Sequence, residues 1–526
     1  MIAHLETDVL IIGGGFAGLR AAIESAKYST NVIIITKKKL ARSGSSVMSS
    51  GAFAVPLGCN DSVEAFIADV VKGGCSINDS RLVTVLAQEV VDRLYELEKW
   101  GVCFPKRGRS YVFSLSGEHS FPRVIAPLSG KGLEITQALE KQVIANGCRV
   151  LDNLIVVDLL GDGERVTGAI CVNRVEPSLI VIWSKTTILA TGGAGQLFKV
   201  TSNPKDITGD GYAMALRAGA TLRDMEFIQF YPWRIVKPAP FKKTRVPIQP
   251  STFALGAKLL NSKGERFMEA YDPVRKEATS RDIAARAIYE QIRAGRDVDG
   301  GVLLDLSDLS DEEFALANPK AAIILRQAGV SPRSVRLILA PEAHFFMGGI
   351  RTDTEGQSEL RGLLAAGEVA GGVHGANRLN GCAIAEALVF GRRSGARAGQ
   401  VSCEGGICRN DDLGRIDYWK KRVGDIKKSG RTANSEEITR LLGQVKTQAE
   451  SSLGIVRCKE KLQSGRELFE DICHRAIEIT PKSMEDFCSL ISLENLCAVA
   501  LACSEAALFR EESRGCLLYT SPSPRD

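Results

Sequence analysis

The sequence lacks the cysteine patterns that mark metal and redox sites. Its 14 cysteines include no pair in C-x-x-C spacing, and Cys403 and Cys408 are separated by four residues. That spacing is not typical of a zinc or iron–sulfur site, so we expect no bound metal. Scattered thiols without a regular framework also favour a reducing compartment over a secreted, disulfide-rich protein.

A strong charge of one sign and long apolar runs are also missing. The formal net charge is only +5 over 526 residues, and there is no basic stripe, so nucleic acid is not an expected partner. No uninterrupted apolar run reaches the ~18 residues of a membrane helix. The first strand begins too early to leave room for a signal peptide. We therefore expect a cytoplasmic protein with no membrane span of its own, which would associate with a membrane only through a partner subunit.

A glycine motif near the N-terminus is the strongest feature that is present. Residues 8–12 are an apolar run typical of a buried parallel strand, and Gly13, Gly15 and Gly18 follow in G-x-G-x-x-G spacing. An apolar stretch at 19–26 predicts the next helix. The three glycines allow a tight turn, a close approach of a pyrophosphate and close helix–strand packing, and the helix N-terminus attracts phosphate. The motif predicts a dinucleotide site.

The residue expected to bind the nucleotide ribose is less usual. An acidic residue normally stands ~20 residues beyond the glycines, but Thr36 and Lys37 stand at the end of the second predicted strand, 31–36. A threonine hydroxyl can bond a ribose hydroxyl. The basic run 37–39 suits either a 2′-phosphate or a solvated loop, and both readings stay open. The Ser/Gly-rich segment 40–60 is expected to fold against a flat cofactor.

The length allows about three domains, and the pattern of elements divides the chain accordingly. Three strands of an antiparallel meander are expected at 150–160, 166–173 and 179–183, and a separate strand from Thr187 into the small residues that end at Gly195. We predict a nucleotide-binding domain in two parts, an inserted capping domain, a C-terminal helical domain and a tail. Their boundaries are 1–221 and 346–411, 222–345, 412–515, and 516–526. The tail has no helical period, and we interpret it as non-native read-through rather than as a short native terminus.

Several charged residues stand in glycine-rich or turn-like surroundings. Arg281 follows Thr279, which we expect to form a helix-capping pair with Asp282. His344 precedes a bulky run and two glycines. Glu368 stands at a strand end, where an acid can bind a ribose, and Arg378 could clamp a carboxylate through two parallel hydrogen bonds. Each residue taken alone could equally be a structural one.

Taken together, these motifs carry a family resemblance over residues 8–515. The chain resembles the flavoprotein subunits of succinate dehydrogenase and fumarate reductase, and their relative L-aspartate oxidase. The resemblance implies an α/β fold: a Rossmann-like FAD-binding domain with an inserted α+β capping domain and a C-terminal helical domain. The most specific stretches are TGDGYAMALRAGA, GERFMEAY, SRDIAARAI, HFFMGGI, AAGEVAGGVHGANRL and ESRG.

The resemblance also implies site residues, a cofactor and partners. Arg281 matches the arginine that exchanges a proton with the substrate carbon, and His344 and Arg378 match residues that bind a small-molecule dicarboxylate. Gly44 replaces the histidine that links the flavin in covalent relatives, so FAD is expected to be non-covalent. An iron–sulfur electron-transfer subunit is an expected partner. The FAD-binding residues are expected to be Gly13, Gly14, Gly15, Phe16, Ala17, Gly18, Thr36, Lys37, Ser43, Ser45, Gly51, Thr191, Gly192, Asp210, Glu368, Ala383 and Ile384.

Departures from the family pattern keep the substrate open. Tyr231 stands where the family usually has histidine and offers one hydroxyl donor, and Gln249 and Pro250 replace a Thr-Glu pair whose glutamate feeds protons to the arginine. Cys382 and Ala383 replace the usual Asn-Ser beside the flavin. The leading hypothesis is hydride transfer with a C4-dicarboxylate or an analogue. L-Aspartate oxidase and a flavin electron-transfer subunit for another substrate are the alternatives. A scaffold without catalysis is disfavoured by the retained cations.

Overall fold

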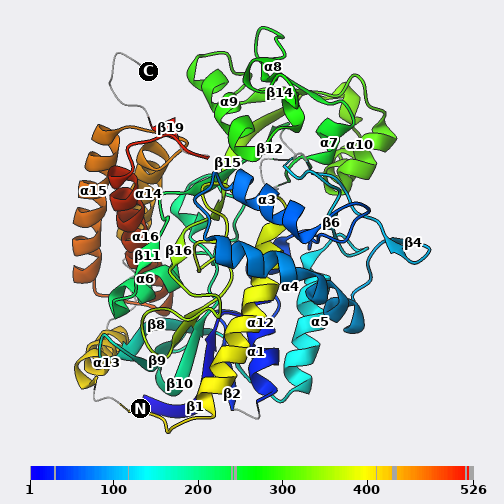
Figure 1. Ribbon diagram of the computed structural model, residues 1–526. Coiled ribbons are helices and arrows are strands. Elements are labelled where there is room, and N and C mark those ends of the chain that lie inside the picture. Colours follow the sequence, from blue (N-terminus) through cyan, green and yellow to red (C-terminus); the bar gives the residue numbers. More distant parts are fainter. Residues whose placement is uncertain are drawn as a thin grey trace.

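A seven-stranded sheet carries the glycine motif (Figure 1). The computed structural model describes residues 2–28, 31–116, 118–238, 241, 246–409, 412–428, 435–515 and 518–519. Neighbouring strands of the sheet follow the order β7-β2-β1-β10-β9-β8, and β17 also pairs with β10. Their bounds are β1 Ile2–Ile12, β2 Val32–Ile35, β7 Arg149–Leu151, β8 Leu154–Gly161, β9 Val166–Asn173, β10 Leu179–Leu189 and β17 Leu363–Ala365.

The sheet is parallel on one side and antiparallel on the other. β2, β1, β10 and β17 pair in parallel, whereas β10, β9 and β8 form the expected antiparallel meander. The separate strand expected from Thr187 is wrong, because it is the end of β10, which continues unbroken from Leu179. One long strand thereby pairs with β9 at its start and with β1 along its whole length.

Alternate residues of the central strand β1 face two different cores. Val9 and Ile11 pack with α1 (Phe16–Ala26), α4 (Ser80–Lys99), α5 (Gly132–Ala145) and α12 (Cys382–Ser402). Leu10 and Ile12 pack with the meander, α6 (Asp210–Ala218) and α16 (Met484–Phe509). A strand buried on both faces explains why the sequence there is continuously apolar.

A four-stranded sheet, in the order β12-β15-β14-β13, forms the core of the capping region at the top of Figure 1. Its apolar interior is separate from the two cores of the nucleotide-binding sheet. The structure thus has the α+β insertion expected from the sequence, while the exact domain boundaries stay a prediction. The elements are β12 Ile228–Lys237, α7 Ser251–Ala254, β13 Lys258–Leu260, α8 Met268–Tyr271, α9 Arg281–Arg293, β14 Val302–Asp305, α10 Asp311–Ala317, α11 Pro319–Gln327 and β15 Leu337–Phe346.

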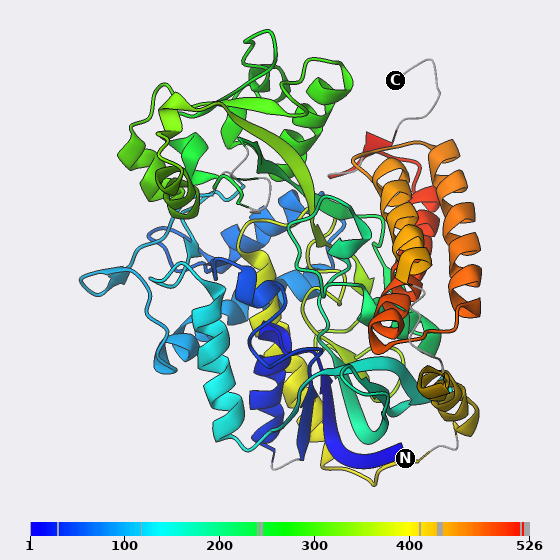
Figure 2. The ribbon, with the colours of Figure 1, turned by 180° about the vertical axis from the view of Figure 1, so that it is seen from behind.

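The C-terminal region is helical, as Figure 2 shows from behind. By length and composition, α16 alone among the described helices could cross a membrane, but 61% of its most apolar window is buried inside the fold. Of the predicted tail, 516–517 and 520–526 lie outside the described residues, and β19 (Leu518–Tyr519) pairs with β18 (Val456–Arg457). The other helices here are α13 Leu413–Lys428, α14 Ser435–Ser452 and α15 Lys459–Glu478.

The remaining short elements connect these layers. Residues 61–100 contain two helices, α3 (Val63–Gly73) and α4. The others are α2 Ser45–Met48, β3 Phe53–Ala54, β4 Lys106–Arg107, β5 Ser110–Tyr111, β6 Val124–Ile125, β11 Leu222–Arg223 and β16 Gly349–Ile350.

Candidate active site

One cavity of about 1000 Å³ extends from the glycine motif to Arg281 of the capping region and to Arg378. Gly18 and Gly51 do not line it, because Gly18 packs against the backbone of Gly13 and Gly51 against Pro127 and Gly132. All the other residues expected from the sequence do: Gly13, Gly14, Gly15, Phe16, Ala17, Thr36, Lys37, Ser43, Ser45, Thr191, Gly192, Asp210, Arg281, His344, Glu368, Arg378, Ala383 and Ile384.

The glycine motif forms a tight turn that has no room for side chains at Gly13 and Gly18. Gly13 has a φ of 122°, in the range that favours glycine, and a Cβ there would lie 2.2 Å from the carbonyl oxygen of Ala190. A Cβ on Gly18 would lie 1.9 Å from the carbonyl oxygen of Gly13. The backbone is therefore open on the cavity side and tightly packed behind it, which fits a bound pyrophosphate.

Two helix N-termini and two buried hydroxyls also fit FAD. α1 begins at the cavity without an acidic residue in its first turn, and α12 begins there with Ala383 and Ile384 in its first turn. Such ends offer unpaired backbone N–H groups to anionic or carbonyl oxygens. The hydroxyls of Ser45 and Thr191 are buried without a hydrogen-bond partner. A cofactor with many oxygen acceptors would satisfy them.

The end of the cavity near Thr36 and Lys37 is organised by acids that lie far away in the sequence. The Thr36 hydroxyl donates to Asp152 Oδ1 at 2.8 Å, and Lys37 forms an ion pair with Asp210. Asn495 of α16 donates to Asp210 Oδ1 at 3.0 Å. Pairing with Asp210 neutralises Lys37, which argues against the 2′-phosphate reading. Asp152 was not expected from the sequence, because it follows β7, which meets β2 only in the folded sheet.

Two arginines converge on one glutamine at the other end of the cavity. Gln229 Oε1 accepts from Arg378 at 2.7 Å and from Arg281 at 3.2 Å, and the amide of Gln229 donates to Asn377 Oδ1 at 2.8 Å. Arg281 also donates to Asn380 Oδ1 at 2.8 Å. Burial and the charge of Arg281 lower the pKa of Arg378 to about 10, so Arg378 remains cationic at neutral pH. Two buried cations that share a neutral acceptor favour an anionic ligand.

His344 lies on the same cavity as the arginines and has a neutral ring. Burial, Arg378 and Arg281 hold its pKa well below the ordinary value. Its Nδ1 is 2.7 Å from the Ser202 hydroxyl. A neutral ring whose Nδ1 accepts from that hydroxyl carries its proton on Nε2, the nitrogen a carboxylate can use.

Glu368 is a partly buried acid at the cavity wall. Burial raises its pKa to about 7, while the backbone N–H of Phe346, which donates to Oε1 at 3.1 Å, works against that shift. A carboxyl group that titrates near neutrality can either accept or donate a hydrogen bond. It is thereby suited to the FAD ribose contact expected of it.

Two local expectations are corrected by the geometry. The Tyr231 hydroxyl donates to the carbonyl oxygen of Ile248 at 2.7 Å, so it is not directed at a ligand, and only the ring faces the site, with Arg281 5.0 Å from its centroid. The capping pair is also wrong, because Ser280 is the N-cap of α9 and the Thr279 hydroxyl donates to Asp272 at 2.6 Å. Spacing alone could not distinguish adjacent hydroxyl residues.

Comparison with known proteins agrees with this geometry. The model of the FAD binding domain family matches residues 8–384, and that of the fumarate reductase flavoprotein C-terminal family matches 443–521. The chain belongs to this family of flavoproteins. It is an FAD-dependent oxidoreductase, as the resemblance implied.

Named relatives of this flavoprotein fall into two groups. It is 36% identical to a subunit of the fumarate reductase (CoM/CoB) of Methanothermobacter marburgensis, over 97% of this chain and 93% of that protein. It is 31% identical to L-aspartate oxidase of Synechocystis, over 97% and 93%.

Solved structures agree with these relatives. A point mutant of E. coli quinol fumarate reductase FrdA superposes with a TM-score of 0.90 at 26% identity, covering 99% of this chain and 92% of that one. Mycobacterium smegmatis Sdh1 has a TM-score of 0.85 at 29% identity, with 98% and 89% covered.

Every cysteine in the described part of the chain is a free thiol, and the residues of that part include no cluster of three or more potential metal ligands. Cys382, beside the cavity, is buried, and burial raises the pKa of its thiol to about 12. It therefore remains a protonated thiol at neutral pH.

We expect the flavoprotein to release its FAD on acid precipitation. Gly44 lines the cavity and offers no nucleophile for a flavin bond. Yellow colour should pass into the supernatant, and the protein band on a denaturing gel should show no flavin fluorescence. Fluorescence that stays with the band after boiling would instead demonstrate a covalent link from another residue.

Proposed function

We propose that this flavoprotein transfers a hydride between FAD and a C4-dicarboxylate or a close analogue, with Arg281 moving the proton. The observation that carries the proposal is the convergence of Arg281, Arg378 and His344 on the cavity that begins at the glycine cradle. FAD, when bound, supplies hydride exchange at N5 of the flavin. The chain supplies the remaining chemistry.

Each of the three residues has a role that its surroundings support. Arg378 and neutral His344 bind one carboxylate, and their hydrogen bonds polarise it while negative charge develops at the neighbouring carbon. Arg281 is held by Gln229 and Asn380, which both accept from its guanidinium, so its terminal nitrogens have fixed positions. An arginine is a weak acid by its ordinary pKa, and positioning must therefore provide much of its effect.

The proposal includes an electron-transfer partner. The Methanothermobacter relative is by name one subunit of its fumarate reductase, and similar structures come from quinol-fumarate reductase. We therefore propose that an iron–sulfur subunit donates or accepts the electrons, and any attachment to a membrane would be through such a partner. Co-purification from the native host, followed by measurement of iron and labile sulfide, tests this part separately.

A substrate panel tests the reaction class. The reduced holoenzyme is mixed with fumarate or crotonate, and the oxidised holoenzyme with succinate or L-aspartate, while the flavin absorbance is followed. Reoxidation by fumarate or reduction by succinate supports the proposal. Reduction by L-aspartate alone would instead support L-aspartate oxidase, the function that the second group of relatives carries. No response to any of the four acids would contradict the proposal.

The unaltered protein should bind fumarate about tenfold to a hundredfold more weakly than a variant with histidine at position 231. The Tyr231 hydroxyl is already bonded to Ile248, and Pro250 carries neither a donor nor an acid. One missing charge-assisted hydrogen bond is worth about 1.5–3 kcal/mol, which gives this factor. Titration of the flavin spectrum should show tighter fumarate binding in Tyr231→His and unchanged binding in Tyr231→Phe. Micromolar affinity of the unaltered protein would show that other residues replace the missing donor.

A further inference from the structure

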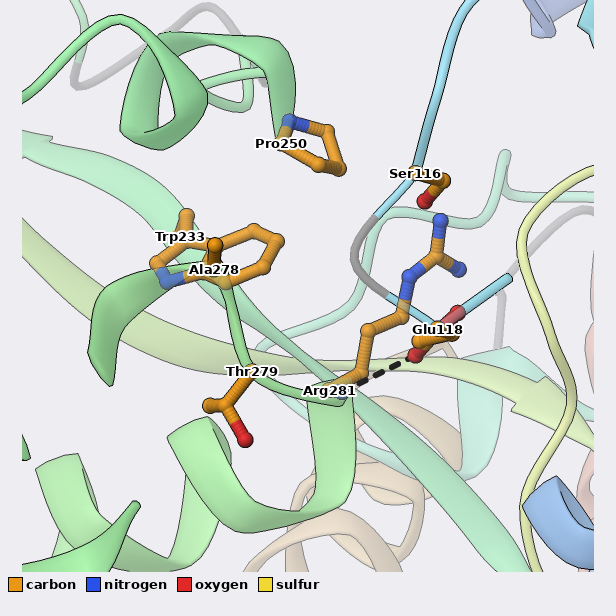
Figure 3. Close-up of a pocket in the computed structure, with 7 residues that line it drawn as sticks. All are labelled: Ser116, Glu118, Trp233, Pro250, Ala278, Thr279 and Arg281. Atoms are coloured by element: carbon orange, nitrogen blue, oxygen red, sulfur yellow. Dashed lines mark hydrogen bonds between the residues drawn. The ribbon is translucent and has the colours of Figure 1, made fainter. Parts of the chain in front are cut away.

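A second, much smaller pocket lies against Arg281 (Figure 3). Its volume is about 10 Å³, which is close to the space that one water molecule requires. Ser116, Glu118 and Arg281 contribute polar groups to its wall, and Pro250 and Trp233 close it. Arg281, Ser116 and Pro250 also line the large cavity, so Arg281 borders both the proposed substrate site and this pocket.

The guanidinium of Arg281 is held by side-chain amides. Its terminal nitrogens donate to the amide oxygens of Gln229 and Asn380, and its Nε is buried without a hydrogen-bond partner. Within the described ranges, no carboxylate accepts a hydrogen bond from its guanidinium. An arginine that gives up a proton in every turnover must recover one, and neither of these amides can supply it.

Glu118 is the carboxylate that faces this pocket. Its Oε1 accepts from the backbone N–H of Arg281 at 2.9 Å, and its Oε2 accepts from the backbone N–H of Asn380 at 2.9 Å. Each carboxylate oxygen retains a further acceptor site for a water molecule. Glu118 is partly exposed, so it can exchange protons with solvent.

The neighbouring acid does not offer the same path. Asp282 follows Arg281 directly but does not line the small pocket. Its Oδ1 accepts from Asn377 at 3.3 Å and from the Ser280 hydroxyl, and its Oδ2 lies 3.8 Å from Arg286. Pro250, which occupies the usual place of the proton-feeding glutamate in the family, borders the same pocket as Glu118.

The geometry points to Glu118 as the group that returns protons to Arg281 through one water molecule in this pocket; the inference rests on the proposed proton transfer by Arg281. After Arg281 has given an N–H proton to the substrate carbon, the water gives a proton to the neutral guanidine. The carboxylic acid of Glu118 then gives its proton to the same water oxygen. Solvent reprotonates the carboxylate, so each turnover consumes one solvent proton, and no group on this path changes its oxidation state.

Glu118 thus acts through Arg281 and does not touch the substrate. Its loss should therefore spare the first turnover and slow the later ones. In the holoenzyme with reduced flavin, Arg281 begins protonated, so the first reoxidation by fumarate needs no help from Glu118. Glu118→Gln should keep that first reoxidation within about threefold, whereas steady-state turnover with reduced methyl viologen should fall about a hundredfold, as for a lost acid–base group. Glu312→Gln, at an exposed position on α10, is the matched control and should change neither rate.

A small acid should restore the lost step. The steady-state rate of Glu118→Ala should rise with added formate, and formate should exceed acetate when the two are compared at equal concentrations of the protonated acid, because formic acid is the stronger acid. The melting temperature and the FAD content of each variant are measured in parallel, and they should match the unaltered protein for Glu118→Gln.

Two results would overturn the inference. In one, Glu118→Gln lowers the first reoxidation and the steady state equally and formate restores neither, which means that Glu118 only holds the start of α9. In the other, steady-state turnover stays within about threefold. Failure of the proposed function would look different, because Arg281→Lys would then retain turnover whatever the Glu118 variants do.

Discussion

Arg281→Lys should lower turnover at least about a hundredfold while FAD stays bound, since that is the smaller end of the range for a lost acid–base group. Arg281 places its two terminal nitrogens on Gln229 and Asn380 at the same time. A lysine has one nitrogen on a flexible chain, so it keeps the charge but loses this planar, two-point positioning. Carboxylate binding should therefore weaken much less than turnover.

The measurement is steady-state turnover together with the flavin-to-protein absorbance ratio. Arg293→Lys, at the exposed end of the same helix, is the matched control and should behave as the unaltered protein does. If Arg281→Lys turns over within about threefold of the unaltered protein, Arg281 is not the proton carrier. Loss of FAD from the variant would show instead that Arg281 supports the cofactor site.

Gly18→Ala should weaken FAD binding even though Gly18 does not line the cavity. The new methyl group would lie 1.9 Å from the Gly13 carbonyl oxygen, which belongs to the backbone and cannot turn away as a side chain can. Overpacking of this kind costs about 1–3 kcal/mol. The strain falls on the turn that fits the pyrophosphate, and FAD affinity should fall by about fivefold to 150-fold.

Equilibrium dialysis of the apoprotein against FAD measures this loss. Gly443→Ala on α14 is the matched control, because a Cβ there meets nothing within 4 Å. An alanine inside a helix is favoured over glycine, so the control should bind FAD normally and melt no lower. Unchanged FAD affinity in Gly18→Ala would mean that α1 can shift away from β1 without disturbing the turn.

The sequence predicted those features that a short stretch of chain determines. The glycine turn, the strand before it and the helix after it depend on neighbouring residues, and all three are confirmed. The C-terminal helices also followed from their helical period, whereas the α+β fold of the insertion was implied by the family resemblance. The strand from Thr187 was misjudged because Ser184 and Lys185 break the apolar run, although the backbone of β10 continues through them.

Contacts between distant segments could not be predicted in this way. Asp152 reaches Thr36 because β7 is placed beside β2, and Glu118 reaches Arg281 because a loop of the nucleotide-binding region meets the start of α9. Neither pairing has a signature in spacing. The direction of the Tyr231 hydroxyl was likewise unpredictable, since its acceptor is a backbone carbonyl whose position depends on the capping fold.

The hydrogen bonds around Asp210 connect the cofactor site to the far end of the chain. Lys37 binds this carboxylate from the end of β2, Thr208 donates to Oδ1 at 2.8 Å, and Asn495 reaches it from the middle of α16. Removing α16 would leave a buried acid with fewer donors, which is costly in a low-dielectric interior. The helical region and the nucleotide-binding sheet should therefore lose their structure in a single cooperative transition, with the cofactor leaving at the same temperature.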